Sequence, residues 1–235
     1  MSRRDVDQTL PWMGAGTEFL LRAVDALPDD ALAAPSALPG WTRAHVVGHL
    51  ARNAEALTRL ATWARTGVET PMYADAEQRA KDIESSAHLP VATLRADLVG
   101  TAADLDEALA GLDAGAWAAQ IRSALGRAIP ATEVPWMRVR EVWLHAVDLD
   151  CGASTADFPE GVVDTLLDDV TGALSAKDDC PAVLLAPTDR EQTWTLGGDG
   201  GPEVRGEAAE LVSWLTGRSD GTGLTGTVPA PPRWI

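Results

Sequence analysis

The chain has 235 residues, of which 46% are hydrophobic, so it is long enough for two compact domains or one large domain with a sizeable core. No apolar run approaches the ~20 residues that span a bilayer, and residues 1–5 lead into no signal-peptide core, so we expect a cytoplasmic protein. Against 35 Asp and Glu residues there are 19 Lys and Arg, and the net charge of −16 disfavours nucleic acid and anionic membranes as partners. An anionic substrate would therefore need a few well-placed arginines.

The first expected helix covers 7–27, where apolar residues recur at helical spacing. After a turn marked by proline and glycine, a second helix is expected over 43–65, with Thr42 as its N-cap. This helix carries His49 beside its apolar stripe and His45 one turn earlier. A histidine at such an edge is commonly a core residue, whereas a His-x-x-x-His pair can bind a metal ion, and the pattern leaves both interpretations open.

Two further helices are expected at 75–84 and 90–112, the first polar and containing Arg79, the second amphipathic. We interpret the segment 111–135 as a long link. A fourth long helix is expected over 135–150, because a proline marks its start and a glycine follows its end. Four long helices with one long crossover are typical of a bundle of up and down helices.

The last of these helices carries three titratable side chains on one face. Glu141 and His145 are four residues apart and Asp148 lies three beyond His145, so all three leave the same side. A solvent face bearing an ordinary Glu and His would explain them, and so would a metal site, because a carboxylate and an imidazole at this spacing can share one cation. In a bundle, the second and fourth long helices can face each other, which would bring His49 to this face as a third ligand.

The composition changes after Cys151, and residues 152–159 are expected to link to a smaller α/β unit. The glycine cluster at 197–201 precedes no helix, so we interpret it as a hairpin turn between two strands rather than a phosphate loop. Arg218 follows the glycine that ends the last helix. The elements expected in this unit are a helix with an apolar stripe over 162–174, strands at 182–186, 192–196 and 203–206, and a helix at 208–216.

Two cysteines, Cys151 and Cys180, are too few for a disulfide framework or a cysteine-rich zinc module. We expect both to be buried and inert. Cys151 follows His145 by six residues and therefore points away from the face that carries it. Any thiol chemistry would use a thiol from outside the chain.

Several stretches together resemble the mycothiol-dependent maleylpyruvate isomerases. They are 40–49 (Gly-Trp-Thr-Arg-Ala-His-Val-Val-Gly-His), 69–73 (Glu-Thr-Pro-Met-Tyr), 138–148 and the closing 231–234 (Pro-Pro-Arg-Trp). The resemblance runs over nearly the whole chain, in the same order and at a compatible length. The helix-borne histidines alone resemble the wider superfamily of DinB-like metal-binding bundles, and it is 69–73 and the tail that favour the isomerase branch.

The resemblance implies an α+β protein, with a DinB-like four-helix bundle over residues 1–153 followed by a small α/β domain over 160–235. It also implies a zinc ion held by His49, Glu141 and His145. Three protein ligands leave a tetrahedral zinc ion one open position, as a catalytic site requires.

The family's activity implies how such a site would work. Zinc lowers the pKa of the mycothiol thiol below its free value of about 8.5 and supplies a thiolate at neutral pH. Reversible addition of this thiolate makes the double bond of maleylpyruvate temporarily single, so that the adduct rotates and expels the thiolate to leave fumarylpyruvate. Arg79 and Arg218 match the family's substrate-handling arginines and would grip the two carboxylates, with a surface position as the alternative for each. Asp148 would either orient His145 or lie on the surface.

Two other functions stay open. A mycothiol-dependent S-transferase of the same fold would use the same zinc and thiolate on another electrophile. A non-catalytic binding protein with a structural metal would be favoured by a fourth protein ligand, for which His45 is the candidate.

Overall fold

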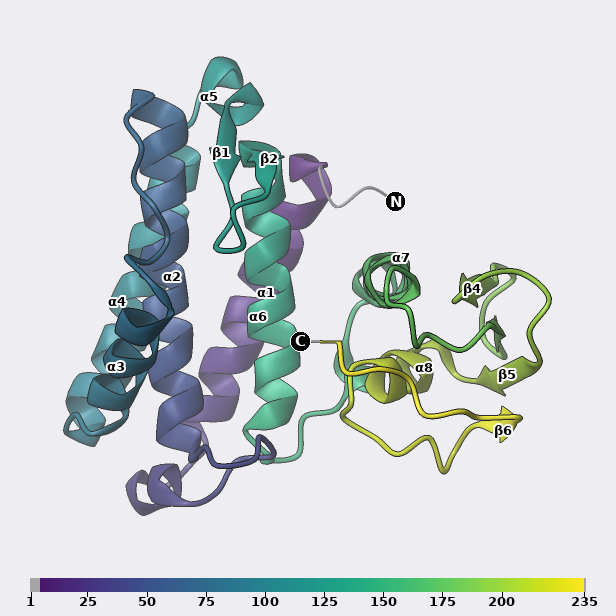
Figure 1. Ribbon diagram of the computed structural model, residues 1–235. Helices are drawn as coiled ribbons and strands as arrows, with labels where there is room; N and C mark the ends of the chain where they lie inside the picture. The colour runs from purple at the N-terminus through teal and green to yellow at the C-terminus, as the bar shows by residue number, and fades with distance from the viewer. Residues whose placement is uncertain (1–4, 235) are drawn as a thin grey trace. The chain divides into compact units, whose positions relative to one another are not determined.

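The computed structural model describes residues 5–234 of the chain. These residues form two compact units, which are divided in sequence between Ala153 and Ser154. The first unit is a helical bundle and the second a small sheet with helices (Figure 1), so the expected α+β class is confirmed. None of the described helices is long and apolar enough to cross a membrane.

The N-terminal unit is built on four long helices. They are α1 (Val6–Asp25), α2 (Arg43–Thr66), α4 (Val91–Ala110) and α6 (Val134–Asp148). Around the bundle, α1 packs on α6, α6 on α2, and α2 on α4 (Figure 1), so the second and fourth long helices are neighbours as expected. Leu50, Leu57 and Leu60 of α2 are fully buried. Each contributes about 1.5–3 kcal/mol through burial of its side chain, which makes α2 the central helix of this core.

Shorter elements connect the long helices. They are η1 (Asp29–Ala33), α3 (Ala76–Ala87), α5 (Ala114–Ala118), β1 (Gln120–Arg122), β2 (Ala128–Pro130) and η2 (Ala131–Glu133). Most of them lie in the segment 111–135, for which the sequence predicts only a link. There β1 and β2 pair antiparallel, with Ile121 opposite Ile129 and both side chains buried. Gly126, with φ of +76°, supplies the left-handed backbone of the connecting turn.

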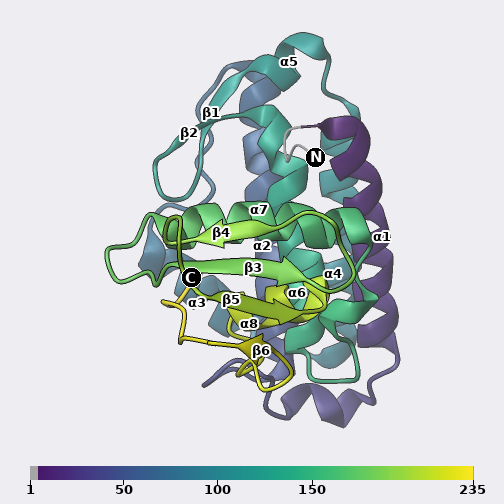
Figure 2. The same cartoon turned by 90° about the vertical axis from the view of Figure 1, so that its right-hand side faces the viewer.

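The C-terminal unit places two helices on one face of a four-stranded sheet (Figures 1 and 2). Its elements are η3 (Thr155–Asp157), α7 (Glu160–Ser175), β3 (Val183–Pro187), β4 (Trp194–Leu196), β5 (Glu203–Gly206), α8 (Ala208–Leu215) and β6 (Thr225–Gly226). The strand order is β4-β3-β5-β6, as Figure 2 shows. Buried residues of α7 and α8 recur at helical spacing and pack against each other and the sheet.

The glycine cluster at 197–201 does not form the predicted hairpin turn. In the sheet β3 lies between β4 and β5, antiparallel to the first and parallel to the second. The cluster instead carries the chain past the start of β3. A Cβ at Gly197 would lie 2.4 Å from the Pro181 carbonyl oxygen, and one at Gly201 would lie 1.9 Å from that of Ala182. Glycine is required because the two backbones approach too closely for any side chain.

The expectation of two buried cysteines was wrong, since Cys151 is exposed and Cys180 is half-buried. Helix α6 ends at Asp148, and Cys151 follows in a turn after Asp150, whose φ is +51°. Desolvation nonetheless raises the pKa of both thiols, and neighbouring aspartates add to this effect. Neither cysteine is therefore an activated nucleophile at neutral pH.

A close approach of α1 to α6 depends on Gly16. A Cβ at this position would lie 2.5 Å from Nε1 of Trp143 and 2.5 Å from Cγ2 of Val142. Trp143 donates its indole N–H to the carbonyl oxygen of Trp12 at 3.0 Å and stacks on Phe19. Helix α6 is thus fixed against α1 with no room for an added methyl group.

Gly16→Ala is expected to lower the free energy of unfolding by about 1–3 kcal/mol, because the new methyl group overpacks α1 against α6. Gly14→Ala is the matched control, since no atom lies within 4 Å of a Cβ at Gly14. This control should raise the free energy of unfolding by about 0.5–1 kcal/mol, the usual gain of alanine over glycine inside a helix. Urea denaturation measures both, and equal stability of the two variants would contradict the packing argument.

Candidate metal centre

Helix α2 supplies the first residue of the site. Thr42 caps this helix as predicted, with its side chain accepting from the backbone N–H of His45. The His45 ring completes the cap, because its Nδ1 lies 3.2 Å from the Thr42 backbone nitrogen, and its Nε2 contacts Oε2 of Glu84 at 3.2 Å. His49 lies one turn further on and is only 3% exposed. The two histidines of α2 therefore have separate partners and do not form a shared metal site.

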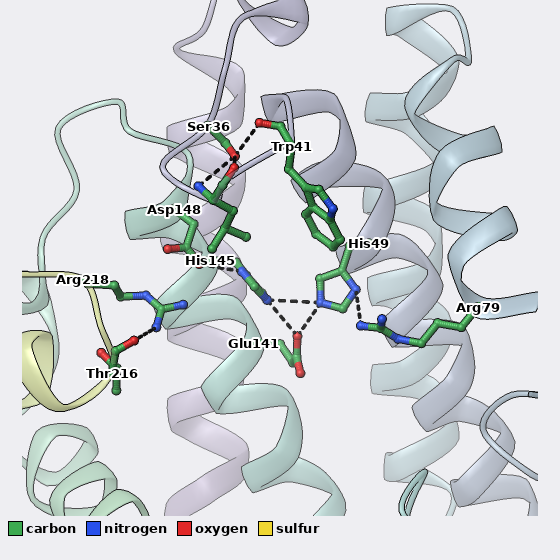
Figure 3. Close-up of polar contacts among 10 residues, drawn as sticks. Ser36, Trp41, His49, Arg79, Glu141, His145, Asp148, Thr216 and Arg218 are labelled. Carbon is green, nitrogen blue, oxygen red and sulfur yellow. Dashed lines mark hydrogen bonds and ion pairs between the residues drawn. The ribbon is translucent and has the colours of Figure 1, made fainter. Parts of the chain in front are cut away.

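Helix α6 supplies the other two residues, and Figure 3 shows all three side chains converging. Nε2 of His49 lies 2.8 Å from Oε2 of Glu141 and 3.1 Å from Nε2 of His145. The Glu141 oxygen and the His145 nitrogen are 3.2 Å apart. Among the residues that the structure describes, this is the only group of at least three His, Cys, Asp or Glu side chains close enough to share a metal ion. An ordinary solvent face is thereby excluded for Glu141 and His145.

The donor set fits zinc. Each of the three side chains directs a ligand atom at the other two, so two imidazole nitrogens and a carboxylate oxygen form a triangle with edges of 2.8, 3.1 and 3.2 Å. A tetrahedral zinc ion with bonds of about 2.0–2.1 Å holds its ligand atoms about 3.3 Å apart. The triangle is close to that size, and two imidazoles with one carboxylate are a common catalytic zinc set.

Asp148 holds His145 in place. Its carboxylate is 1% exposed, and its Oδ2 accepts from Nδ1 of His145 at 2.8 Å (Figure 3). A proton held on Nδ1 leaves the lone pair of Nε2 directed at His49 and Glu141, as a metal ligand requires. Of the two interpretations left open for Asp148, the structure supports the orienting one.

Burial and mutual charge separate the pKa values of the three residues. Burial lowers the pKa of His49 below its usual value, although Glu141 opposes this. Burial would raise the pKa of Glu141, but the charges and hydrogen bonds of His49 and His145 outweigh it and hold that pKa well below the ordinary one. Burial alone would lower the pKa of His145, but the hydrogen bonds to Asp148 and Glu141 outweigh burial, so this pKa is raised above its usual value. The centre therefore keeps an ionised carboxylate between two imidazoles at neutral pH.

Arg79 lies beside this centre. Asp75 caps α3 by accepting from the backbone N–H of Gln78 at 2.7 Å, which fixes the helix that carries Arg79. The Arg79 guanidinium lies over the ring of Tyr73, 5.6 Å from its centroid. Nη2 of Arg79 is 3.5 Å from Nδ1 of His49, as Figure 3 shows by a dashed line. The Arg79 side chain is thus half-buried beside His49, and its role in substrate handling stays a prediction.

Two aromatic residues at the site were missed in the sequence. The Trp41 ring meets the His49 ring edge-on, with centroids 5.6 Å apart. Tyr73 lies beneath Arg79, and burial raises the pKa of its hydroxyl. Both residues lie in stretches that carry the family resemblance, 40–49 and 69–73. That resemblance was the signal in the sequence that could have identified them as residues of the site.

Arg218 belongs to the C-terminal unit. It follows Gly217, whose φ of +75° ends α8 with a left-handed residue. Its backbone N–H donates to the Ser213 carbonyl at 2.7 Å, and Nη1 donates to the Thr216 carbonyl at 3.1 Å. The side chain is half-buried within this fixed turn. A role for Arg218 in substrate binding stays a prediction.

The fold and the site define a class: a helical bundle with a His, Glu, His metal centre, followed by a small α/β unit. Two family models match the chain in this order. The Mycothiol maleylpyruvate isomerase N-terminal domain matches residues 13–150, and the MDMPI C-terminal domain matches residues 157–233. The chain belongs to the mycothiol-dependent maleylpyruvate isomerase family.

Solved structures agree with this assignment. The crystal structure of the mycothiol-dependent maleylpyruvate isomerase is 34% identical, covers 100% of both chains and superposes with a TM-score of 0.91. A crystal structure of a histidine-to-alanine mutant of that isomerase is also 34% identical over 100% of both chains, with a TM-score of 0.92. No curated protein sequence matches the chain.

In the metal-free protein, Asp148→Asn is expected to lower the pKa of His145, because it removes the carboxylate that accepts the Nδ1 proton. Titration of the histidine ring protons by NMR measures the change. Asp113→Asn is the control, since Asp113 caps α5 and has no bond to a histidine. An unchanged His145 pKa in Asp148→Asn would show that Asp148 does not govern the ring.

Proposed function

We propose that this protein is a zinc- and mycothiol-dependent isomerase that converts maleylpyruvate to fumarylpyruvate. The observation that carries the proposal is the convergence of His49, Glu141 and His145 in a chain that belongs to this family along both units. Zinc bound by these residues would activate the thiol of mycothiol, whose reversible addition to the substrate frees the carbon–carbon double bond to rotate.

The three ligands suit this chemistry because of their charge. Glu141 contributes a single negative charge, and His49 and His145 bind as neutral imidazoles, so a dication at the centre keeps a net positive charge toward a thiolate. Asp148 retains the Nδ1 proton of His145 and keeps that ring turned to the centre. Neither chain thiol competes for the reaction, because both cysteines have raised pKa values.

We propose that Arg79 and Arg218 bind the two carboxylates of the substrate. This role of Arg79 is supported by its position beside His49 and by the Tyr73 ring, over which the guanidinium lies. Arg218 is supported by the turn after α8, which fixes its backbone. A planar guanidinium pairs with a carboxylate through two parallel hydrogen bonds, and this suits a chain whose net charge of −16 otherwise repels a dianion.

The proposal has consequences for partners, location and domains. The partners are a small anionic substrate and a low-molecular-weight thiol. The protein would act in the cytoplasm and bind neither nucleic acid nor a membrane. The strongly acidic charge supports this choice. The domains would be residues 1–153 and 160–235, in keeping with the break between Ala153 and Ser154.

Zinc-loaded protein is expected to convert maleylpyruvate to fumarylpyruvate only when mycothiol is present, as followed by absorbance. His49→Ala should lower turnover more than about 100-fold, because groups that merely orient a metal ligand already contribute about 10- to 100-fold. His88→Ala is the control, since His88 is exposed and lies outside the cluster. Removal of zinc by a chelator should abolish turnover, and zinc should restore it.

Absence of isomerisation by zinc-loaded protein with mycothiol would contradict the proposal. Consumption of mycothiol with another electrophile would then assign the chain to the S-transferases of the same fold. A structural metal is not favoured, because His45 is bound to Thr42 and Glu84 rather than to the cluster.

Arg79→Ala and Arg218→Ala are each expected to raise the KM for maleylpyruvate about 10- to 100-fold, the effect of losing a hydrogen bond to a charged group. Steady-state kinetics at saturating mycothiol measure this. Arg65→Ala controls for net charge, because Arg65 is an exposed arginine of α2. Unchanged kinetics of Arg218→Ala would remove the C-terminal unit from the substrate-binding role.

A further inference from the structure

A fully buried arginine lies next to the metal centre and has no part in the proposed chemistry. Arg138 is on α6, one turn before Glu141, and is 1% exposed. It is among the largest fully buried side chains of the described chain. Burial lowers the pKa of its guanidinium to about 10, against the charges of Glu141, Asp106 and Tyr73, which raise it.

The hydrogen bonds of Arg138 are both made to the helix that carries His49. Its Nη1 donates to the carbonyl oxygen of Leu50 at 2.8 Å and to Oδ1 of Asn53 at 2.9 Å. Leu50 is the residue after His49, and Asn53 lies one turn further along α2. Arg138 thus connects α6 and α2 within one turn of the ligands on each helix.

Stability alone does not explain a guanidinium here. Within the described part of the chain, Nε and Nη2 of Arg138 have no hydrogen-bond partner, although both are buried. A buried cation with unsatisfied donors loses hydration that its partners do not replace, and an apolar side chain of similar size commonly packs there at lower cost. The presence of Arg138 is better explained by the arrangement of helices that it enforces.

That arrangement is the position of α2 along α6. The centre depends on contacts of 2.8 and 3.1 Å between His49 and the two residues of α6. A helix rises 1.5 Å per residue, so a slide of about 1 Å between α2 and α6 would already disrupt these contacts. A rigid, planar guanidinium whose Nη1 donates to both a backbone carbonyl and a side-chain amide resists such a slide better than apolar packing does.

We propose that Arg138 is a positioning residue of the metal centre, which fixes α2 against α6 so that His49 meets Glu141 and His145 at metal-binding distance. Zinc binding by this cluster is the one point taken from the proposed function. The alternative is that Arg138 contributes to packing alone, in which case its loss would change stability and leave the metal unaffected.

Arg95 offers a matched comparison within the same unit. It lies on α4 and donates to the carbonyl oxygens of Val24 at 2.5 Å and Leu27 at 2.7 Å, so it also ties one long helix to the chain of another. Its hydrogen-bond and ion-pair partners, Val24, Leu27, Asp25 and Asp29, all lie outside the metal centre. Arg95→Met therefore reports the effect of losing an interhelical arginine away from the ligands.

The experiment compares the full-length wild-type protein with Arg138→Met, Arg138→Lys, Asn53→Ala and Arg95→Met. Zinc dissociation constants are measured by competition with a chromophoric chelator, and the visible spectrum of the cobalt-substituted protein is recorded at saturating cobalt. We expect Arg138→Met to raise the zinc dissociation constant about 10- to 100-fold and to change the cobalt spectrum, as loss of groups that orient ligands does. Arg138→Lys keeps the charge but loses the rigid planar group that holds Nη1 between its two acceptors, and should recover only part of the affinity.

Asn53→Ala removes one of the two acceptors and should weaken zinc binding in the same direction, by less. Arg95→Met should leave the zinc dissociation constant and the cobalt spectrum unchanged, whatever it does to thermal stability. A dissociation constant of folded Arg138→Met within twofold of wild type would overturn the inference, as would an equal loss in Arg95→Met. If Arg138→Met does not fold, an unchanged cobalt spectrum and zinc affinity in Asn53→Ala overturn it instead.

Different results would contradict the proposed function and the positioning role of Arg138. Wild-type protein that binds neither zinc nor cobalt would remove the proposed function together with this inference. Wild-type protein that binds zinc and isomerises maleylpyruvate, beside an Arg138→Met variant of equal zinc affinity, would remove the inference alone.

Discussion

The structure depends on the meeting of three ionisable side chains in the interior of the bundle. His49 comes from α2, and Glu141 and His145 come from α6, so the contact joins segments far apart in the sequence. Burying such groups is unfavourable unless each finds a partner. Here each group is the partner of the other two, and Asp148 fixes the ring of His145. The packing of α2 beside α6 is what gives each of these groups its partners.

Much of this arrangement was predictable from the sequence. The spacing of Glu141, His145 and Asp148 placed them on one face, and Thr42 marked the start of the helix that carries His49. Local signals of this kind involve residues within one or two helical turns of each other, so they can be recognised from the sequence alone. The convergence on His49 needed in addition the order of helices around the bundle, which came from the bundle pattern and the family resemblance.

The parts that sequence analysis missed depend on contacts between distant backbones. The cluster 197–201 carries the signature of a hairpin, yet its glycines serve a close crossing over residues 181–183, which only the sheet order reveals. The strands β1 and β2 have three residues each, too few to show a period of two. Arg138 stood in a stretch that was recognised, but its burial depends on α2, and a charged residue on a helix is ordinarily expected at the surface.

The acidic surface and the cationic groups of the centre act over different ranges. At physiological ionic strength charges are screened beyond about 8 Å, so much of the net charge of −16 is not felt inside the site. Arg79 lies close to His49 and is screened far less, because it is partly buried. A dianionic substrate would thus be held by local contacts rather than drawn in from solution.

Helix α3 differs from its neighbours in how little of it is buried. Only Ile83 and Ser86 of this helix are buried, and Ser86 fits against α2 where Gly48 has no side chain. A helix with so few apolar contacts opens locally at a lower free energy than the bundle core. The three candidate ligands lie on the well-buried helices α2 and α6, whereas Arg79 lies on α3, so local opening of the bundle would free Arg79 before it reaches the ligands.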